Sequence, residues 1–410
     1  MMRDVRKDNG AASPSGTGGT GRDSGGATDS DGGATSEAAS PSTPDANAPQ
    51  SEFESGPPHV QFIGRFDTTD SAGPRCGWPG CRIVARFDGT AVKAHLKDYW
   101  EDYMKGAPSE WDVAIDGVIK NKIVMTANDT EYDLASGLAK GPHVVELYKR
   151  SEAQNGTTQF LGFDFEGGTL MSPPSRRTRH IEIIGDSAAS GFGVEGVGYT
   201  DAGHCPGIEW AATWQDFRKS FGPQLGEFVN AEVYGSVFSG KGISQNIWTT
   251  DSETLPVLFE RTLPTYTNGT TWDTKQWQAD VVIIMAGGND FEIREPTDTG
   301  PATLEQFTNA YAQFVAKLRA DYPSAHIVLT VSSSLSDDQP AGRQSRTNTV
   351  AGVHAVASQR NSQGDARVYA FELDLAQPGE MVGCMSHGSE QSHARIAGEL
   401  AAFIKPKLGW

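Results

Sequence analysis

The sequence has no run of about 18 apolar residues, so it offers no segment that reads as a membrane-spanning helix. Lysine and arginine together number 34 against 52 aspartates and glutamates, which gives a net charge of -18, and the basic residues form no cluster. This dispersed acidic charge argues against a nucleic-acid partner and is typical of a soluble acidic protein. No Cys/His group has the spacing of a zinc site, and we expect neither a metal nor a cofactor.

Cysteine is scarce, but its placement bears on the compartment. Cys76 and Cys81 flank Gly-Trp-Pro-Gly, a span short enough for a local bridge. Cys205 and Cys384 are far apart in sequence, and each lies near a candidate site segment. An even count in this arrangement predicts two disulfides, Cys76–Cys81 and Cys205–Cys384, in an oxidising compartment. The alternative is four reduced, buried thiols in a cytosolic protein.

The N-terminus shows no export signal, because residues 1–7 are charged and no apolar stretch follows them. If the disulfides form, we expect a protein that is secreted or tethered at the cell surface, with its export signal not present in this chain. We also expect a monomer without a membrane span.

Composition divides the chain into three parts. Residues 1–56 are dominated by Gly, Ser, Thr, Ala, Asp and Pro, and Phe53 is their one aromatic residue. Such a segment cannot bury enough apolar surface to offset its ordering entropy, so it is predicted to be a disordered tail or linker. Residues 58–172 contain many short, alternating segments between turn signals such as Asp88-Gly89, which is typical of a β-sandwich.

The third part, residues 178–410, alternates apolar runs with helical patterns. This alternation predicts a parallel sheet covered on both faces, that is, a three-layer α/β/α domain. The expected strands are 181–184, 231–234, 281–286, 327–331 and 368–373, and the expected helices are 210–221, 304–322, 348–359 and 394–404.

Four of these strands are followed by residues suited to acyl transfer. The first ends in Gly185-Asp186-Ser187, which places a serine hydroxyl at the carboxyl edge of the sheet. A neutral serine needs a base to accept its proton, and His387, between the last strand and the last helix, returns to the same edge. We therefore predict Ser187 as nucleophile and His387 as general base.

An oxyanion also needs hydrogen-bond donors, and the same edge supplies them. The predicted donors are the Ser187 backbone N–H, the Gly240 backbone N–H after the second strand, and the Asn289 side-chain amide after the third. Asp186 and Asp290 are interpreted as backbone caps, because short aspartates often serve this purpose in turns.

Together these segments resemble the SGNH (GDSL-like) hydrolase superfamily, whose blocks carry Ser, Gly, Asn and His, here matched by Ser187, Gly240, Asn289 and His387. Upstream, Arg65-Phe66-Asp67, Ala72-Gly73-Pro74-Arg75 and Ala85-Arg86-Phe87-Asp88-Gly89-Thr90 resemble the jelly-roll domain of carbohydrate esterase family 2. The resemblance covers about 58–410. It implies a jelly-roll sandwich before an SGNH-type domain, and removal of O-acetyl groups from plant polysaccharides such as xylan and glucomannan.

The sequence departs from the superfamily beside the histidine. Relatives usually carry an Asp two or three residues before it, whereas this chain reads Cys384-Met385-Ser386-His387-Gly388. The acid of a triad holds the imidazole in one tautomer, and a backbone carbonyl can accept the same Nδ1–H bond. We therefore expect a Ser-His dyad oriented by the main chain.

Substrate contacts are harder to predict. Trp248, Trp272 and Trp277 lie in the long insert between the second and third strands and are candidate contacts for an acetylated polysaccharide or oligosaccharide. Two other functions stay open: a short-chain lipid or aryl esterase on the same scaffold, and a non-catalytic polysaccharide-binding protein in which the missing Asp marks a decayed site.

Overall fold

The computed structural model describes residues 53–54, 56–100, 108–200, 204–208, 210–292, 300–338 and 341–410. The predicted tail, residues 1–56, thus lies outside the described residues except at Phe53, Glu54 and Gly56. Phe53 forms a bridge to Pro174, and the Arg86 guanidinium lies 3.6 Å from the centroid of its ring. The end of the predicted tail therefore contacts the β-rich region.

Residues 61–171 form two antiparallel sheets. One has the order β1-β3-β8-β5-β6, with β10 also paired to β3, and the other has the order β2-β9-β4-β7. Their strands are β1 (Gln61–Ile63), β2 (Arg75–Cys76), β3 (Arg82–Gly89), β4 (Val92–Tyr99), β5 (Glu110–Ile115), β6 (Val118–Val124), β7 (Glu131–Ala135), β8 (Gly141–Lys149), β9 (Thr157–Asp164) and β10 (Thr169–Met171).

Strand β4 shows why this part of the sequence forms a sandwich. Val92, Ala94 and Leu96 are fully buried, and the side chains between them are less buried. Because successive strand residues point to opposite faces, this alternation gives one apolar face and one polar face. The apolar faces of the two sheets share one core, which contains Ile83 of β3 and Phe160 of β9.

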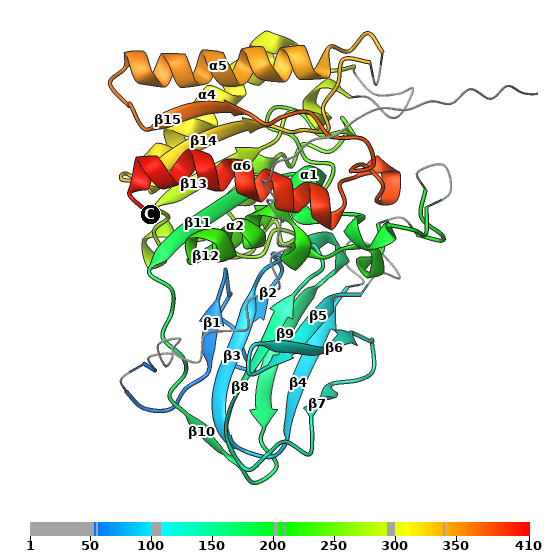
Figure 1. Ribbon diagram of the computed structural model, residues 1–410, viewed down its shortest axis with the longest axis vertical. Coiled ribbons are helices and arrows are strands. Elements are labelled where there is room, and N and C mark those ends of the chain that lie inside the picture. Colours follow the sequence, from blue (N-terminus) through cyan, green and yellow to red (C-terminus); the bar gives the residue numbers. More distant parts are fainter. Residues whose placement is uncertain are drawn as a thin grey trace, which may run out of the picture. The chain divides into compact units, whose positions relative to one another are not determined.

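Residues 179–372 supply a five-stranded sheet of the order β12-β11-β13-β14-β15, in which every pairing is parallel (Figure 1). This sheet and its order agree with the predicted α/β class. The strands are β11 (Arg179–Gly185), β12 (Ala231–Val237), β13 (Val281–Met285), β14 (His326–Val331) and β15 (Val368–Glu372).

Helices cover both faces of this sheet. Residues of α2 and α6 pack with Ile181 and Ile183, whereas residues of α4 and α5 pack with Val282 and Ile284 on the other face. The helices are α1 (Ser187–Ser190), α2 (Phe221–Val229), α3 (Leu255–Phe259), α4 (Leu304–Asp321), α5 (Ser345–Ser362) and α6 (Glu390–Leu408). Among the described residues, no helix combines the length and apolar character needed to cross a membrane.

The expected helix at 210–221 is wrong. Two short 3₁₀ turns, Ala212–Trp214 and Phe217–Lys219, occupy most of it, and α2 begins only at Phe221. The Asp216 side chain accepts a hydrogen bond from the Arg218 N–H at 2.9 Å and so caps the second turn. Such local side-chain bonds compete with a continuous helix.

A buried ion pair joins the β-rich region to the parallel sheet. Arg65 Nη2 lies 3.0 Å from Glu182 Oε1, and both side chains are almost completely buried. Glu182, on the inner strand β11, also accepts bonds from Ser236 Oγ at 2.6 Å and Tyr322 Oη at 3.1 Å. Removing one partner of such a pair typically costs about 3–5 kcal/mol, because the other charge stays buried.

Candidate active site

Ser187 stands just past the carboxyl end of β11, an inner strand of the sheet. Strand β11 ends at Gly185, and Asp186 caps the short helix α1 by accepting the Ala188 N–H at 3.0 Å. A Cβ at Gly185 would lie 2.5 Å from the Met285 carbonyl oxygen, so the tight packing against β13 requires glycine. As predicted, Asp186 is a backbone cap, and it places Ser187 as the first residue of α1.

The imidazole of His387 bridges two groups. Its Nε2 lies 2.8 Å from Ser187 Oγ, and its Nδ1 lies 3.0 Å from the Cys384 carbonyl oxygen. A carbonyl can only accept, so Nδ1 carries the proton of this bond. In the neutral ring Nε2 is then an acceptor aimed at the Ser187 hydroxyl, which is the arrangement a general base needs.

The loop before His387, which carries the Cys384 carbonyl, has an unusual backbone conformation. Met385 and Ser386 both have positive φ angles, 51° and 56°, a region that residues other than glycine rarely adopt. Such strain persists only where the surroundings fix the backbone. Here Cys384 N–H donates to Gly193 O at 3.1 Å, and Gly383 N–H donates to His387 O at 2.9 Å.

A disulfide adds a covalent restraint to this loop. Cys205 and Cys384 are bonded, as the sequence predicts. Together with Phe192 they form a small buried cluster, and the Phe192 ring lies 4.7 Å from the imidazole of His387, centroid to centroid. The residue whose carbonyl orients His387 is therefore also the residue that the disulfide fixes.

Gly240 and Asn289 belong to the loops that follow β12 and β13. Gly240 has φ of +78°, and a Cβ there would lie 2.7 Å from the Trp248 ring, so glycine is required. Among the described residues, the N–H groups of Ser187 and Gly240 have no protein acceptor. The Asn289 amide donates to Asp186 Oδ2 at 3.1 Å and to the Lys241 carbonyl at 2.9 Å, so it fixes the loop beside Gly240.

The carboxylates nearest in sequence to the motifs have other partners. Asp290 accepts the N–H groups of Ile243, Ser244 and Gln245, which makes it the backbone cap that the sequence predicts. Glu390 lies 3.5 Å from Lys219 Nζ. The bond that orients His387 thus comes from the main chain.

A pocket of about 590 Å³ opens at this edge of the sheet. Ser187, Asn289 and His387 all line it, together with Ile247 and His393. Burial lowers the pKa of the His393 imidazole to about 4, with a further contribution from His387. His393 is therefore neutral at physiological pH, and it lines the pocket as an uncharged ring. Among the described residues, no group of three His, Cys, Asp or Glu side chains could hold a metal ion.

Two of the three predicted tryptophan contacts are wrong. Trp277 is buried, stacks on Tyr234 with ring centroids 3.8 Å apart, and donates to Glu232 Oε1 at 2.8 Å. Trp272 is buried in the same apolar core. Trp248, in contrast, is 44% exposed and stands over Gly240, next to the pocket residue Ile247. The sequence around Trp272 and Trp277 reads as a loop, so their packing against β12 was not predicted.

The predicted Cys76–Cys81 disulfide is also wrong. Both cysteines are buried as free thiols. Cys76 ends β2 and Cys81 directly precedes β3, strands of different sheets, and the Cys81 thiol donates to the Arg65 carbonyl at 3.7 Å. The spacing does bring the two thiols together, because burial and then a hydrogen bond with Cys81 raise the pKa of the Cys76 thiol, but no bridge joins them.

Several contributors escaped the sequence analysis. Phe192 packs against His387, and Met385 and Ser386 carry the strained backbone. No periodic pattern marks these residues. The departure from the usual Asp was the one available signal, because it required another group to orient the imidazole.

We predict that reducing Cys205–Cys384 impairs the site before it unfolds the sheet. The bridge spans 179 residues and contributes about 5 kcal/mol in the loop-entropy model. With increasing reductant, labelling of Ser187 by a fluorophosphonate should slow while far-ultraviolet circular dichroism stays unchanged. The variant Cys205→Ala/Cys384→Ala serves as control, since reductant should not affect its labelling. Thiol blocking that finds both cysteines free in the native protein would contradict the prediction.

We predict a pH-dependent stability term from Asp186. Burial, reinforced by the Asp290 charge, raises the pKa of its carboxyl to about 7, from 3.8. Between these values the folded protein holds a proton that the unfolded chain has released, so the free energy of unfolding falls as pH rises.

Asp186→Asn cannot ionise, and relative to the wild type it should gain up to about 4 kcal/mol between pH 4 and pH 8. Urea unfolding at several pH values measures the difference. Asp133→Asn, at an 84% exposed side chain, is the control and should follow the wild type. Parallel curves for the wild type and Asp186→Asn would show that the prediction is wrong.

Comparison with known proteins places this geometry in a family. Residues 62–174 match the family described as carbohydrate esterase 2 N-terminal, and residues 183–386 match the GDSL-like lipase/acylhydrolase family. The chain is 30% identical over 353 residues to the cellulase/esterase CelE of Acetivibrio thermocellus, covering 86% of this chain and 40% of that protein. It is 26% identical to an acetylxylan esterase/glucomannan deacetylase of Cellvibrio japonicus, covering 86% and 90% of the two chains.

A solved structure supports the same assignment over nearly its whole length. A family two carbohydrate esterase from Clostridium thermocellum, in complex with cellohexaose, is 30% identical and has a TM-score of 0.76. The match covers 86% of this chain and 100% of that one. This chain combines a β-rich region with a parallel sheet, and the Ser187–His387 contact lies at the carboxyl edge of that sheet. The chain therefore belongs to carbohydrate esterase family 2.

Proposed function

We propose that this protein is a serine esterase that removes O-acetyl groups from plant cell-wall polysaccharides such as xylan and glucomannan. The observation that carries the proposal is the 2.8 Å contact between Ser187 Oγ and His387 Nε2, with Nδ1 bound to a carbonyl. Two Cellvibrio japonicus relatives carry the name acetylxylan esterase/glucomannan deacetylase.

The chemistry follows from the geometry. Ser187 Oγ attacks the acetyl carbonyl carbon while His387 Nε2 takes the hydroxyl proton, and the carbonyl oxygen becomes an oxyanion. The N–H groups of Ser187 and Gly240, which have no acceptor among the described residues, would stabilise that charge. Both amide hydrogens of Asn289 are already donated, so Asn289 would hold the loop beside Gly240. When the C–O bond to the sugar breaks, His387 returns the proton to the leaving sugar oxygen. Water then attacks the acyl-enzyme by the same route, which releases acetate and restores Ser187.

In this proposal the pair acts as a dyad in which the Cys384 carbonyl takes the orienting role that a carboxylate has in a triad. The triad acid of other serine hydrolases fixes the tautomer and steadies the imidazolium. The Cys384 carbonyl fixes the same tautomer, and its dipole faces the ring nitrogen that carries the proton. The Cys205–Cys384 disulfide also supports action outside the cytosol, secreted or at the cell surface.

Acetate release from acetylated xylan and glucomannan tests the proposal. Ser187→Ala should lower the rate by about 10³-fold or more, because it removes the nucleophile. Glu390→Gln is the matched control and should retain the wild-type rate. A large loss in Glu390→Gln would overturn the dyad, since it would reveal a carboxylate acting on His387. A wild-type protein that releases no acetate and resists fluorophosphonate would instead be a polysaccharide-binding protein, and a preference for octanoyl over acetyl esters would indicate a lipid esterase.

Trp248 is proposed as a contact for a sugar ring, because its exposed ring stands beside the pocket residue Ile247. Trp248→Ala should raise KM for acetylated xylan several-fold and leave KM for 4-nitrophenyl acetate, which has no sugar, unchanged. Phe228, exposed on α2 near the opposite edge of the sheet, is the control position. Equal KM changes for both esters, or none, would contradict this role.

A further inference from the structure

Glu152 is a completely buried carboxylate that the proposed mechanism does not use. It follows β8 and precedes a short 3₁₀ turn (Ala153–Asn155) at the end of the β-rich region. Its two oxygens accept bonds from Ser239 of the parallel-sheet region, Oε2 from the Ser239 N–H and Oε1 from Ser239 Oγ, both at 2.7 Å. The Ser190 side chain on α1 is a further hydrogen-bond partner of this carboxylate. Ser239 directly precedes Gly240.

The surroundings fix Glu152 from the other side. Its N–H donates to Gln215 Oε1 at 2.8 Å, and its carbonyl accepts from Lys149 Nζ at 3.1 Å. Burial raises the pKa of the Glu152 carboxyl, whereas the bonds from Ser239, the bond from Ser190 and the Lys149 charge lower it. A buried carboxylate is held only where donors compensate its desolvation, and here Ser239 provides two of them.

These bonds complete the anchoring of the loop that contains Gly240, residues 239–242. Farther along the loop, the Lys241 carbonyl accepts from Asn289, and Gly242 N–H donates to Asn246 Oδ1 at 3.0 Å. At its start, Glu152 holds Ser239. The N–H of Gly240 therefore lies between two anchored residues, one of which is fixed by the β-rich region.

We propose that Glu152 is a positioning residue that holds the 239–242 loop so that the Gly240 N–H faces the developing oxyanion. This inference rests on the proposed esterase function. It makes the β-rich region a part of the catalytic machinery, although none of its residues lines the pocket described above.

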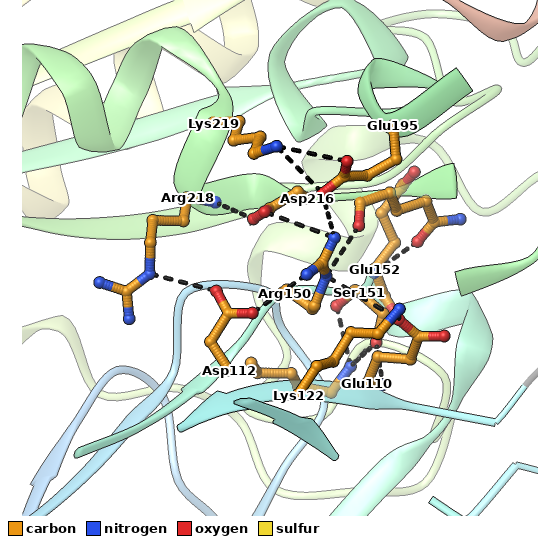
Figure 2. A network of polar contacts seen from close by, with 12 residues as sticks. Glu110, Asp112, Lys122, Arg150, Ser151, Glu152, Glu195, Asp216, Arg218 and Lys219 are labelled. Atoms are coloured by element: carbon orange, nitrogen blue, oxygen red, sulfur yellow. Dashed lines mark hydrogen bonds and ion pairs between the residues drawn. The ribbon is translucent and has the colours of Figure 1, made fainter. Parts of the chain in front are cut away.

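A second set of charges nearby offers a matched control. Figure 2 shows Glu152 beside a network centred on Arg150, which lies 3.1 Å from Asp112 Oδ1, 2.5 Å from Glu195 Oε1 and 3.4 Å from Asp216 Oδ2. Asp112 is buried and joins the same two regions, and it also accepts from Arg218 Nε at 3.3 Å. Within the described part of the chain, its hydrogen bonds and ion pairs join it to Arg150 and Arg218 and not to the 239–242 loop.

The test compares steady-state kinetics on 4-nitrophenyl acetate in the full chain. Glu152→Ala should lower kcat about 10- to 100-fold with little change in KM, less than the about 10²- to 10³-fold loss on removing an oxyanion donor outright. Glu152→Gln should recover most of kcat, because its amide can accept the Ser239 N–H and donate to Ser239 Oγ. Ser239→Ala, which loses one of the two bonds, should lie between them. Asp112→Asn should lower the thermal midpoint but keep kcat within about twofold of the wild type.

Two outcomes would overturn the proposal: a folded Glu152→Ala protein with wild-type kcat, or a loss of kcat in Asp112→Asn as large as that in Glu152→Ala. If Glu152→Ala does not fold, Glu152→Gln and Ser239→Ala decide, and wild-type kcat in Ser239→Ala would overturn it. Failure of the esterase function itself is distinguished by a wild-type rate no higher than that of Ser187→Ala.

Discussion

The site depends on one hydrogen bond, from His387 Nδ1 to the carbonyl oxygen of Cys384. A carbonyl has no proton to give, so this bond leaves Nε2 free to accept from Ser187. A carboxylate achieves the same with a full charge, which tolerates small errors in position. A neutral dipole tolerates them less, because its field falls off faster with distance. The disulfide, the Phe192 ring and two residues with positive φ angles together supply the rigidity that this substitution demands.

Buried charges link the two regions of the molecule at separate places. Arg65 reaches Glu182 in the middle of strand β11, and Arg150 binds acids from both regions (Figure 2). An unpaired charge in such buried surroundings would be costly. Each region therefore supplies the opposite charge for a buried charged side chain of the other region. This complementarity makes each of these polar groups depend on its partner region.

Much of the fold could be predicted because its signals are local. Alternation in β4 and Ile-rich runs ending in small residues specify strands, and parallel strands bring their carboxyl ends to one edge, which is how Ser187 and His387 could be placed together. The errors arose where packing decides. Trp272 and Trp277 lie in a Gly/Thr-rich insert that reads as loop, yet their rings fill the core against Tyr234. Cys76 and Cys81 have the spacing of a bridge and their thiols are neighbours, yet both remain free and buried. Glu152, 35 residues before Ser187, carries no motif at all.

The Glu152 carboxylate, which accepts two hydrogen bonds from Ser239, belongs to the β-rich region. From sequence alone, that region would be treated as an interchangeable module. If these hydrogen bonds position the 239–242 loop, the β-rich region and the parallel-sheet region cannot be recombined freely with those of other proteins. A transplanted hydrolase region would retain its own serine and histidine but reach a foreign sandwich with no acid at the matching place. The two regions would then have to be inherited together. A change at position 152 should accompany a change at position 239.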